Sequence, residues 1–295
     1  MNESHSSNPE NPVNRRSFLR KAGGAAAAMA GLSVMPPPAS AQSTTSYTPS
    51  PDTPEEIFTT MLIAEDLATV FYYQGLSGPV IQDPNLAGPG GSYNHITTGS
   101  AISVDNLRGA FTEDITHAKL FRSMLYGSAA LGDADPVQTF YFPTGTFDTL
   151  EPFVRTLEEL KQILISAYMC VVREFTALAV AGHSYVVNGV TYQVRDFIYF
   201  AYLASSMLGV EAEHRALGRV IDPTLIPDLI PANNYNYEAQ NDIVWVTNRG
   251  ARAAAAKVAP FTKPGSGLVA YTLQDALRYQ DGYRIQTILT IPGLI

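Results

Sequence analysis

Residues 204–217 read A-S-S-M-L-G-V-E-A-E-H-R-A-L, and the pattern in this stretch decides the fold. The apolar residues of one helix face are separated by three or four residues or by sums of these numbers. This spacing holds for Ala204, Met207 and Leu217. Glu211 and His214 continue the same face and lie three residues apart. The stretch therefore predicts a helix over residues 196–220 that carries a carboxylate and an imidazole on its inward side.

Two further helices repeat this arrangement. In the helix predicted over residues 104–126, Asp114 and His117 lie three residues apart on a stripe that is otherwise apolar. In the helix predicted over residues 54–74, Glu65 lies in the middle of an apolar stripe. Three predicted helices thus bring ionisable groups to positions where apolar residues are expected.

The remaining predicted helix, over residues 148–180 and third in chain order, has a lysine in the corresponding place. Lys161 lies on the apolar stripe, and no acidic residue occupies the middle of that stripe. Two arrangements are open: Lys161 pairs with the carboxylates and replaces the charge of a metal, or its amine extends outward to solvent. Tyr168 is either an ordinary core aromatic residue or a hydrogen-bond donor to one of the carboxylates.

Buried carboxylates are costly unless they are paired or bind a metal ion. In di-metal carboxylate bundles, two helices each supply one Glu and the other two each supply Glu-x-x-His. Carboxylates and imidazoles together suit iron or manganese. The sequence therefore predicts a metal site with the ligands Glu65, Asp114, His117, Glu211 and His214. The neighbouring Glu113 and Glu213 point away from the stripes and are expected in solvent.

The order of the elements predicts an all-α fold. Four long helices dominate, and the connector over residues 127–147 is long enough to run the length of the helices. Between the third and fourth helices, Asn188-Gly189 separates two short β-forming runs, which is typical of a hairpin over residues 184–194. We expect a four-helix bundle with a long crossover and a small β-hairpin insertion.

The N-terminus has the layout of a twin-arginine export signal. Arg15-Arg16 is followed by a basic pair, an Ala-rich run and the small-residue site Ala39-Ser40-Ala41. Residues 1–41 are therefore predicted to be a twin-arginine (Tat) signal peptide and residues 42–53 a polar linker. The alternative is a chance basic cluster before an Ala-rich helix. The signal predicts a periplasmic or other extracytoplasmic protein whose partner during export is the Tat translocase.

Composition excludes several functions. The 295 residues are 46% hydrophobic, which is enough for a large core, and the net charge of −8 disfavours binding to nucleic acid. The single cysteine rules out an internal disulfide and any CxxC motif. No second long apolar segment is expected, so the chain should have no stable membrane span after the signal is cleaved.

Several short motifs resemble those of exported bacterial ferritin-like domain proteins, which are related to plant desiccation-related proteins. The resemblance covers residues 54–265 and leaves residues 266–295 as a C-terminal extension. The motifs, in chain order, are I-A-E-D-L-A (63–68), E-D-I-T-H (113–117), F-P-T-G-T-F (142–147), S-A-Y (166–168), E-A-E-H (211–214), N-N-Y-N-Y-E (233–238) and A-P-F (259–261).

The resemblance implies a ferritin-like bundle with iron or manganese bound at Glu65, His117, Glu211 and His214. The chain departs from the family pattern twice. Asp114 stands where a Glu is expected, and Lys161 falls about where the third helix should supply its Glu. Three carboxylates neutralise one divalent ion well, whereas Lys161 would leave a second ion poorly compensated, so the sequence favours one ion over two.

Three functions follow from these observations. The first is a Tat-exported ferritin-like protein that binds one or two Fe or Mn ions for oxidative-stress protection or metal handling. The second is a metal-free structural or stress scaffold, or a unit of a homo-oligomer, in which Lys161 pairs with Glu65 or Glu211. The third is an accessory subunit of an exported oxidoreductase. The sequence identifies no catalytic residue, and enzymatic activity stays open.

Overall fold

The computed structural model describes residues 52–83, 86, 102–127, 132–221, 251 and 256–278. The chain divides into residues Met1–Thr48 and a compact unit of Pro49–Ile295, and all described residues belong to the second. The predicted signal peptide, most of the linker and the motif at 233–238 lie outside the described residues.

The described residues are mostly helical, and four long helices lie where the sequence predicts them. They are α2 (Pro54–Ser77), α4 (Ile102–Tyr126), α5 (Leu150–Ala181) and α6 (Val194–Ile221). Local sequence explains the start of α2, because Thr53 and Glu56 form a reciprocal capping box. The end of α5 is marked by Gly182, whose φ of 72° is the left-handed conformation that favours glycine.

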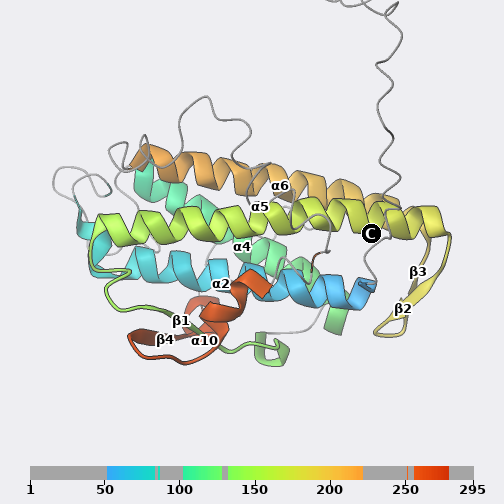
Figure 1. Cartoon of the computed structure of the whole chain (residues 1–295), viewed down its shortest axis with the longest axis horizontal. Coiled ribbons are helices and arrows are strands. Elements are labelled where there is room, and N and C mark those ends of the chain that lie inside the picture. The colour runs from blue at the N-terminus through green and yellow to red at the C-terminus, as the bar shows by residue number, and fades with distance from the viewer. Residues whose placement is uncertain are drawn as a thin grey trace, which may run out of the picture. The chain divides into compact units, whose positions relative to one another are not determined.

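Each long helix packs against two of the others (Figure 1). The most extensive contacts join α5 to α6 and α2 to α4, and smaller contacts join α2 to α5 and α4 to α6. The helices therefore surround a common interior, and the ionisable stripes predicted from the sequence face it.

Contacts along α5 show the directions of its neighbours. Phe58 of α2 meets Phe175 near the end of α5, whereas Gly75 of α2 lies against Phe153 near its beginning, so the two helices are antiparallel. Figure 1 shows α4 and α5 running in the same direction, which requires the connector between them to return along the helices.

Two small antiparallel sheets accompany the helices. β2 (Tyr185–Val187) and β3 (Val190–Tyr192) form the hairpin that Asn188-Gly189 predicts, and both turn residues have positive φ. β1 (Thr139–Pro143), in the crossover, pairs with β4 (Leu268–Thr272).

The C-terminal region contributes to the core. The short helix α10 (Leu273–Leu277) follows β4 and contacts α2. The boundary at residue 265 stays a prediction, but the described residues beyond it pack on the helices (Figure 1).

The apolar core forms two clusters along the helices. One cluster includes Phe71, Phe111 and Phe153, and the other includes Phe58 and Phe175. The ionisable residues of the stripes lie at the level between them, so the candidate site is enclosed by apolar residues along the helix axes.

By length and composition, α5 could cross a membrane, which corrects the expectation that the chain has no second long apolar segment. α5 is apolar because much of it packs in the core: 56% of its apolar window is buried inside the fold. The core helix of a soluble protein meets the same criterion, so this finding is weak evidence for a membrane span.

Candidate metal centre

Four helices bring ionisable side chains into one buried layer. Glu65 comes from α2, Asp114 and His117 from α4, Lys161 from α5, and Glu211 and His214 from α6. The side chains of Glu65, Asp114, Lys161 and Glu211 are fully buried, and the two histidines are at most 8% exposed. Helical spacing of three residues explains why α4 and α6 each present an acid and a histidine on one side.

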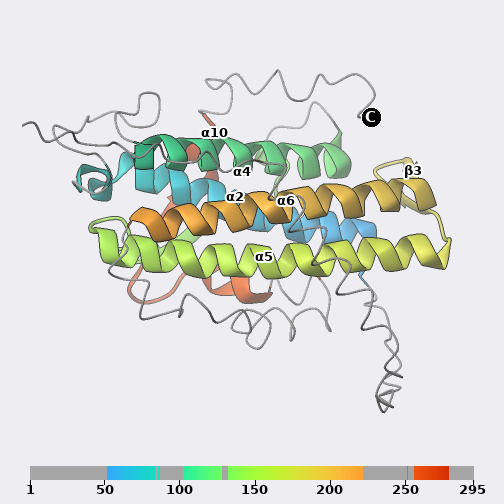
Figure 2. The ribbon, with the colours of Figure 1, turned by 90° about the horizontal axis from the view of Figure 1, so that it is seen from above.

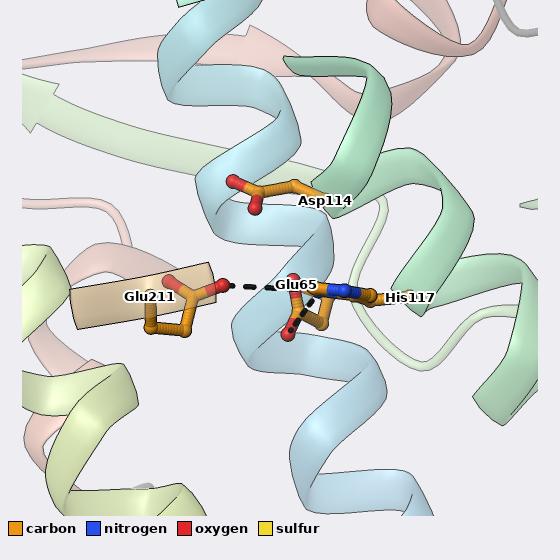
Figure 3. A group of neighbouring side chains, drawn as sticks. All are labelled: Glu65, Asp114, His117 and Glu211. Carbon is orange, nitrogen blue, oxygen red and sulfur yellow. Dashed lines mark ion pairs between the residues drawn. The ribbon is translucent and has the colours of Figure 1, made fainter. Parts of the chain in front are cut away.

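Four of the five predicted ligands form one compact group (Figure 3). One ligand atom from each of Glu65, Asp114, His117 and Glu211 lies within 4.8 Å of the others. His117 Nδ1 lies 3.5 Å from Glu65 Oε1 and 3.8 Å from Glu211 Oε1. These residues could hold a metal ion, whose identity the geometry leaves open.

His214, the fifth predicted ligand, lies beside this group. Its Nδ1 is 3.5 Å from Asp114 Oδ1 and 3.9 Å from Glu211 Oε1. Glu211 Oε1 thus lies near the Nδ1 atoms of both histidines.

Lys161 points inward, into the carboxylates. Its Nζ donates hydrogen bonds to Asp114 Oδ2 at 2.9 Å and to Glu211 Oε2 at 2.8 Å. The same amine lies 4.8 Å from the centre of the Tyr72 ring, a contact that stabilises a buried cation. Of the two arrangements left open by the sequence, the structure has the ion pair, formed with Asp114 and Glu211.

Tyr168 binds the carboxylate of Glu65. Its hydroxyl donates a hydrogen bond to Glu65 Oε1, and its ring lies edge-on to His117. Burial raises the pKa of the Tyr168 hydroxyl well above its usual value, and the charge of Glu65 raises it further. The hydroxyl therefore keeps its proton and holds Glu65 in place.

Glu113 is exposed, as the sequence predicts, and it also contacts a residue of the buried layer. Its side chain is 52% exposed, yet its Oε2 lies 2.7 Å from His214 Nε2. A carboxylate on the outer nitrogen of a histidine orients the ring and leaves the inner nitrogen as the ligand atom. The sequence could not show this contact, because the two residues are 101 positions apart on different helices.

The layer contains buried polar atoms that make no hydrogen bond to the described residues. Each of the five predicted ligands contributes one such atom: Glu65 Oε2, Asp114 Oδ1, His117 Nδ1, Glu211 Oε1 and His214 Nδ1. Buried polar atoms are almost always satisfied in folded proteins, so a group of them calls for an explanation. A cation among them would satisfy oxygen and nitrogen acceptors together, and the donor set fits a transition-metal ion.

Burial and the charges of neighbouring side chains shift the pKa values in the buried layer. Burial raises the pKa of Asp114 well above its usual value, although Lys161 opposes the shift. Burial by itself lowers the pKa of Lys161, but Asp114 and Glu211 outweigh it and raise this pKa well above its usual value. Burial also lowers the pKa of His117, but Glu65 and Glu211 together outweigh burial, so this pKa is raised.

The pKa of His214 is lowered, whereas the pKa of His117 is raised. Burial lowers its pKa, and the charge of Lys161 lowers it further, against the contact with Glu113. A neutral His214 has a lone pair available for a metal ion.

A second buried ion cluster, which the sequence analysis did not identify, lies one residue further along α2. Arg122 donates hydrogen bonds to Asp135 from Nε and Nη2, and Nη2 also donates to Asp66 Oδ1 at 3.1 Å. This cluster joins α2, α4 and the loop after α4. One arginine faces two carboxylates in this cluster, and burial together with the charge of Asp135 raises the pKa of Asp66 well above its usual value.

Comparison of the chain with protein-family models, with curated proteins and with solved structures gives no match. The site is therefore interpreted from its own geometry and chemistry.

Proposed function

We propose that the chain is an exported, ferritin-like four-helix bundle that binds one divalent transition-metal ion. The ligands are Glu65, Asp114, His117 and Glu211, with His214 beside them. The observation that supports this proposal is the compact group of four ligands, each with a buried atom that makes no hydrogen bond.

Charge balance favours one ion over two. The three carboxylates carry three negative charges when ionised, and Lys161 supplies one positive charge in direct contact with two of them. One divalent ion would neutralise the remainder, whereas two would leave a buried excess of positive charge. Lys161 thus takes the electrostatic role that a second ion has in a di-metal bundle.

The donor set favours iron or manganese. Carboxylate oxygens suit hard divalent ions, and imidazole nitrogens suit the first-row transition metals. A bound ion of this kind would supply redox chemistry with oxygen species. The chain's own residues would orient the ligands through Tyr168 and Glu113, and the apolar clusters would exclude bulk water. Oxidative-stress protection or metal handling in the periplasm is the function that joins such a site to the predicted Tat signal.

A metal-free scaffold is the second candidate, and one observation favours it. Lys161 already provides a permanent cation inside the fold, with hydrogen bonds to Asp114 and Glu211. In that case the ion pairs specify how α4, α5 and α6 pack, and no metal is needed. An accessory subunit of an exported oxidoreductase is the third candidate, and co-purification of a redox enzyme from the periplasm would support it.

Metal analysis of the purified protein separates these candidates. We expect about one equivalent of Fe or Mn in the wild-type chain and none above background in the double variant Glu65→Gln/Glu211→Gln. The matched control is Glu151→Gln/Glu159→Gln, which changes two exposed carboxylates of α5. Equal metal content in the site variant and the control would reject the metal site and leave the scaffold.

A further inference from the structure

The outer face of α6 carries a regular stripe of exposed residues. They are spaced three and four residues apart, so they lie along one side of the helix. The α6 stripe consists of Arg195, Ile198, Tyr202, Ser205, Gly209 and Ala212, and every one of them is exposed. Figure 2 shows α6 on the side facing the viewer, with no other labelled helix in front of it.

The stripe has the composition of a packed face. No charged residue occurs between Phe197 and Val210, although the chain has a net charge of −8. Ile198 is 60% exposed and Tyr202 is 70% exposed. An outward helix face is normally polar and charged, as the exposed Asp105 of α4 illustrates. An uncharged outer segment that exposes two large side chains, Ile198 and Tyr202, on an acidic protein therefore indicates a partner surface.

Two copies of the stripe fit each other in shape when the two α6 helices are antiparallel. In an antiparallel pair of α6 helices centred midway between Tyr202 and Ser205, Tyr202 of one copy meets Ser205 of the other. Ile198 in the same way meets Gly209. A Cβ built on Gly209 has no neighbour within 4 Å, so space for a large side chain exists there. Large residues thus meet small ones along the stripe.

In the same antiparallel register, a basic residue of one copy lies near an acidic residue of the other. Arg195, whose side chain is 86% exposed, comes opposite the small Ala212, and the exposed Glu213 is the next residue. Arg195 lies 3.7 Å from Asp196 Oδ1 in its own chain, and its long exposed side chain can also cross Ala212 and reach the Glu213 carboxylate of the other copy. A two-fold axis forms this contact twice, once at each end of the stripe. A parallel pair would instead place Arg195 beside Arg195.

The charge of the whole chain limits where two copies can meet. Away from the stripe the acidic copies repel each other, so a surface without acidic residues is the favoured place for self-association. The middle of the α6 stripe is such a surface.

We propose that the chain forms a homodimer in which two copies pack through their α6 stripes in antiparallel orientation. The proposal concerns the outside of the fold and is independent of metal binding.

Analytical ultracentrifugation of the full-length chain tests the dimer. We expect a mass of about twice the 31.9 kDa of one chain. Ile198→Glu should weaken association about tenfold or more, because it buries a charge in the contact. Ile102→Glu is the matched control, since Ile102 is 81% exposed on α4, and it should leave the dimer intact. A monomeric wild-type chain overturns the proposal, as does equal weakening by the two variants.

Charge reversal tests the register. Arg195→Glu should weaken the dimer, because it places two carboxylates together at each end of the stripe. Adding Glu213→Arg to the same chain should restore association. Circular dichroism should show unchanged helix content in each variant. Failure of the double variant to recover association, with helix content retained, would contradict the proposed pairing.

Engineered cysteines test the orientation, because the native Cys170 is buried. A mixture of Ile198→Cys and Gly209→Cys chains should form the mixed disulfide in preference to either symmetric one. Preferential linkage of Ile198→Cys to itself would indicate a parallel pair and overturn the proposal.

Discussion

Lys161 is the residue on which the chemistry of the site depends. It brings a fixed positive charge to a layer that contains three carboxylates, and it bonds two of them directly. Removing a partner from such a buried pair is costly, because an uncompensated charge stays in the core. The residue therefore sets both the charge of the site and the number of ions that the site can accept.

Lys161→Glu should change metal stoichiometry. The substitution replaces a positive charge with a negative one, so the carboxylates then number four and can compensate two divalent ions. We expect the bound metal to rise from about one to about two equivalents, measured by elemental analysis after titration. If the wild type is metal-free, the variant should gain metal. Lys263→Glu, at an exposed position, should change nothing. A folded variant with unchanged stoichiometry would refute the role assigned to Lys161.

Glu113→Gln tests the support of His214. An amide can still hydrogen-bond the imidazole, but it no longer orients the ring through a charge-assisted contact. We expect metal affinity to fall about 10-fold to 100-fold, which is typical for loss of such a contact. Glu159→Gln is the matched control, at an exposed carboxylate of α5. Titration of both variants with Mn²⁺ gives the comparison, and equal affinities would show that Glu113 has no positioning role.

His117 should make the metal-free protein sensitive to pH. Burial lowers its folded-state pKa, but Glu65 and Glu211 outweigh burial and raise this pKa, so the protonated ring stabilises the fold. This stability is fully present below the unfolded pKa of about 6.5 and is lost as the pH rises through the higher folded pKa. Urea denaturation of metal-free protein should show this loss, and His117→Gln should reduce it. Metal affinity should change in the opposite direction, because a protonated imidazole cannot bind metal.

At the scale of elements, two glycines show where helices approach closely and where they do not. A Cβ on Gly75 of α2 would lie 2.4 Å from the Phe153 ring of α5, whereas a Cβ on Gly109 of α4 would meet nothing within 4 Å. The first glycine therefore permits the contact between α2 and α5. The second serves no packing purpose in the described structure.

Gly75→Ala and Gly109→Ala should have opposite effects on stability. At Gly75 the added methyl group must displace a buried aromatic ring, which costs about 1–3 kcal/mol. At Gly109 the same change raises helix propensity and should stabilise the protein by about 0.5–1 kcal/mol. Urea denaturation monitored by circular dichroism measures both. A neutral Gly75→Ala variant would mean that α2 and α5 can separate without cost.

At the scale of the whole molecule, export and assembly complete the proposal. The Tat route transports folded proteins. A folded domain whose proposed ligands come from three helices can therefore acquire its metal before it crosses the membrane. The apolar α6 stripe adds a dimer contact on the outside of the same domain. The export signal and the α6 stripe both lie outside the buried layer that contains Glu65 and Glu211.

Arg15→Lys/Arg16→Lys should retain the precursor in the cytoplasm. The paired arginines are the part of the signal that the Tat pathway recognises, and lysines keep the charge. We expect fractionation to find the unprocessed chain in the cytoplasm, while wild type reaches the periplasm and is shortened after Ala41. The control Arg20→Lys changes a neighbouring basic residue. Periplasmic accumulation of the double variant would contradict the Tat assignment.

The sequence by itself determined the helices, the hairpin and the inward positions of the five predicted ligands. Helical periodicity is a local property, so Glu65, Asp114, His117, Glu211 and His214 could be assigned to inward faces from spacing alone. The Asn-Gly turn is equally local. Confirmation of these elements by the structure follows from the short range of the forces that specify them.

Only the tertiary structure decided which groups meet. The inward direction of Lys161, the bond from Tyr168 to Glu65 and the contact of Glu113 with His214 all join different helices. The pairing of β1 with β4 likewise joins distant parts of the chain. Such contacts depend on how the helices rotate and slide when their apolar faces pack, and periodicity within one helix carries no information about that packing.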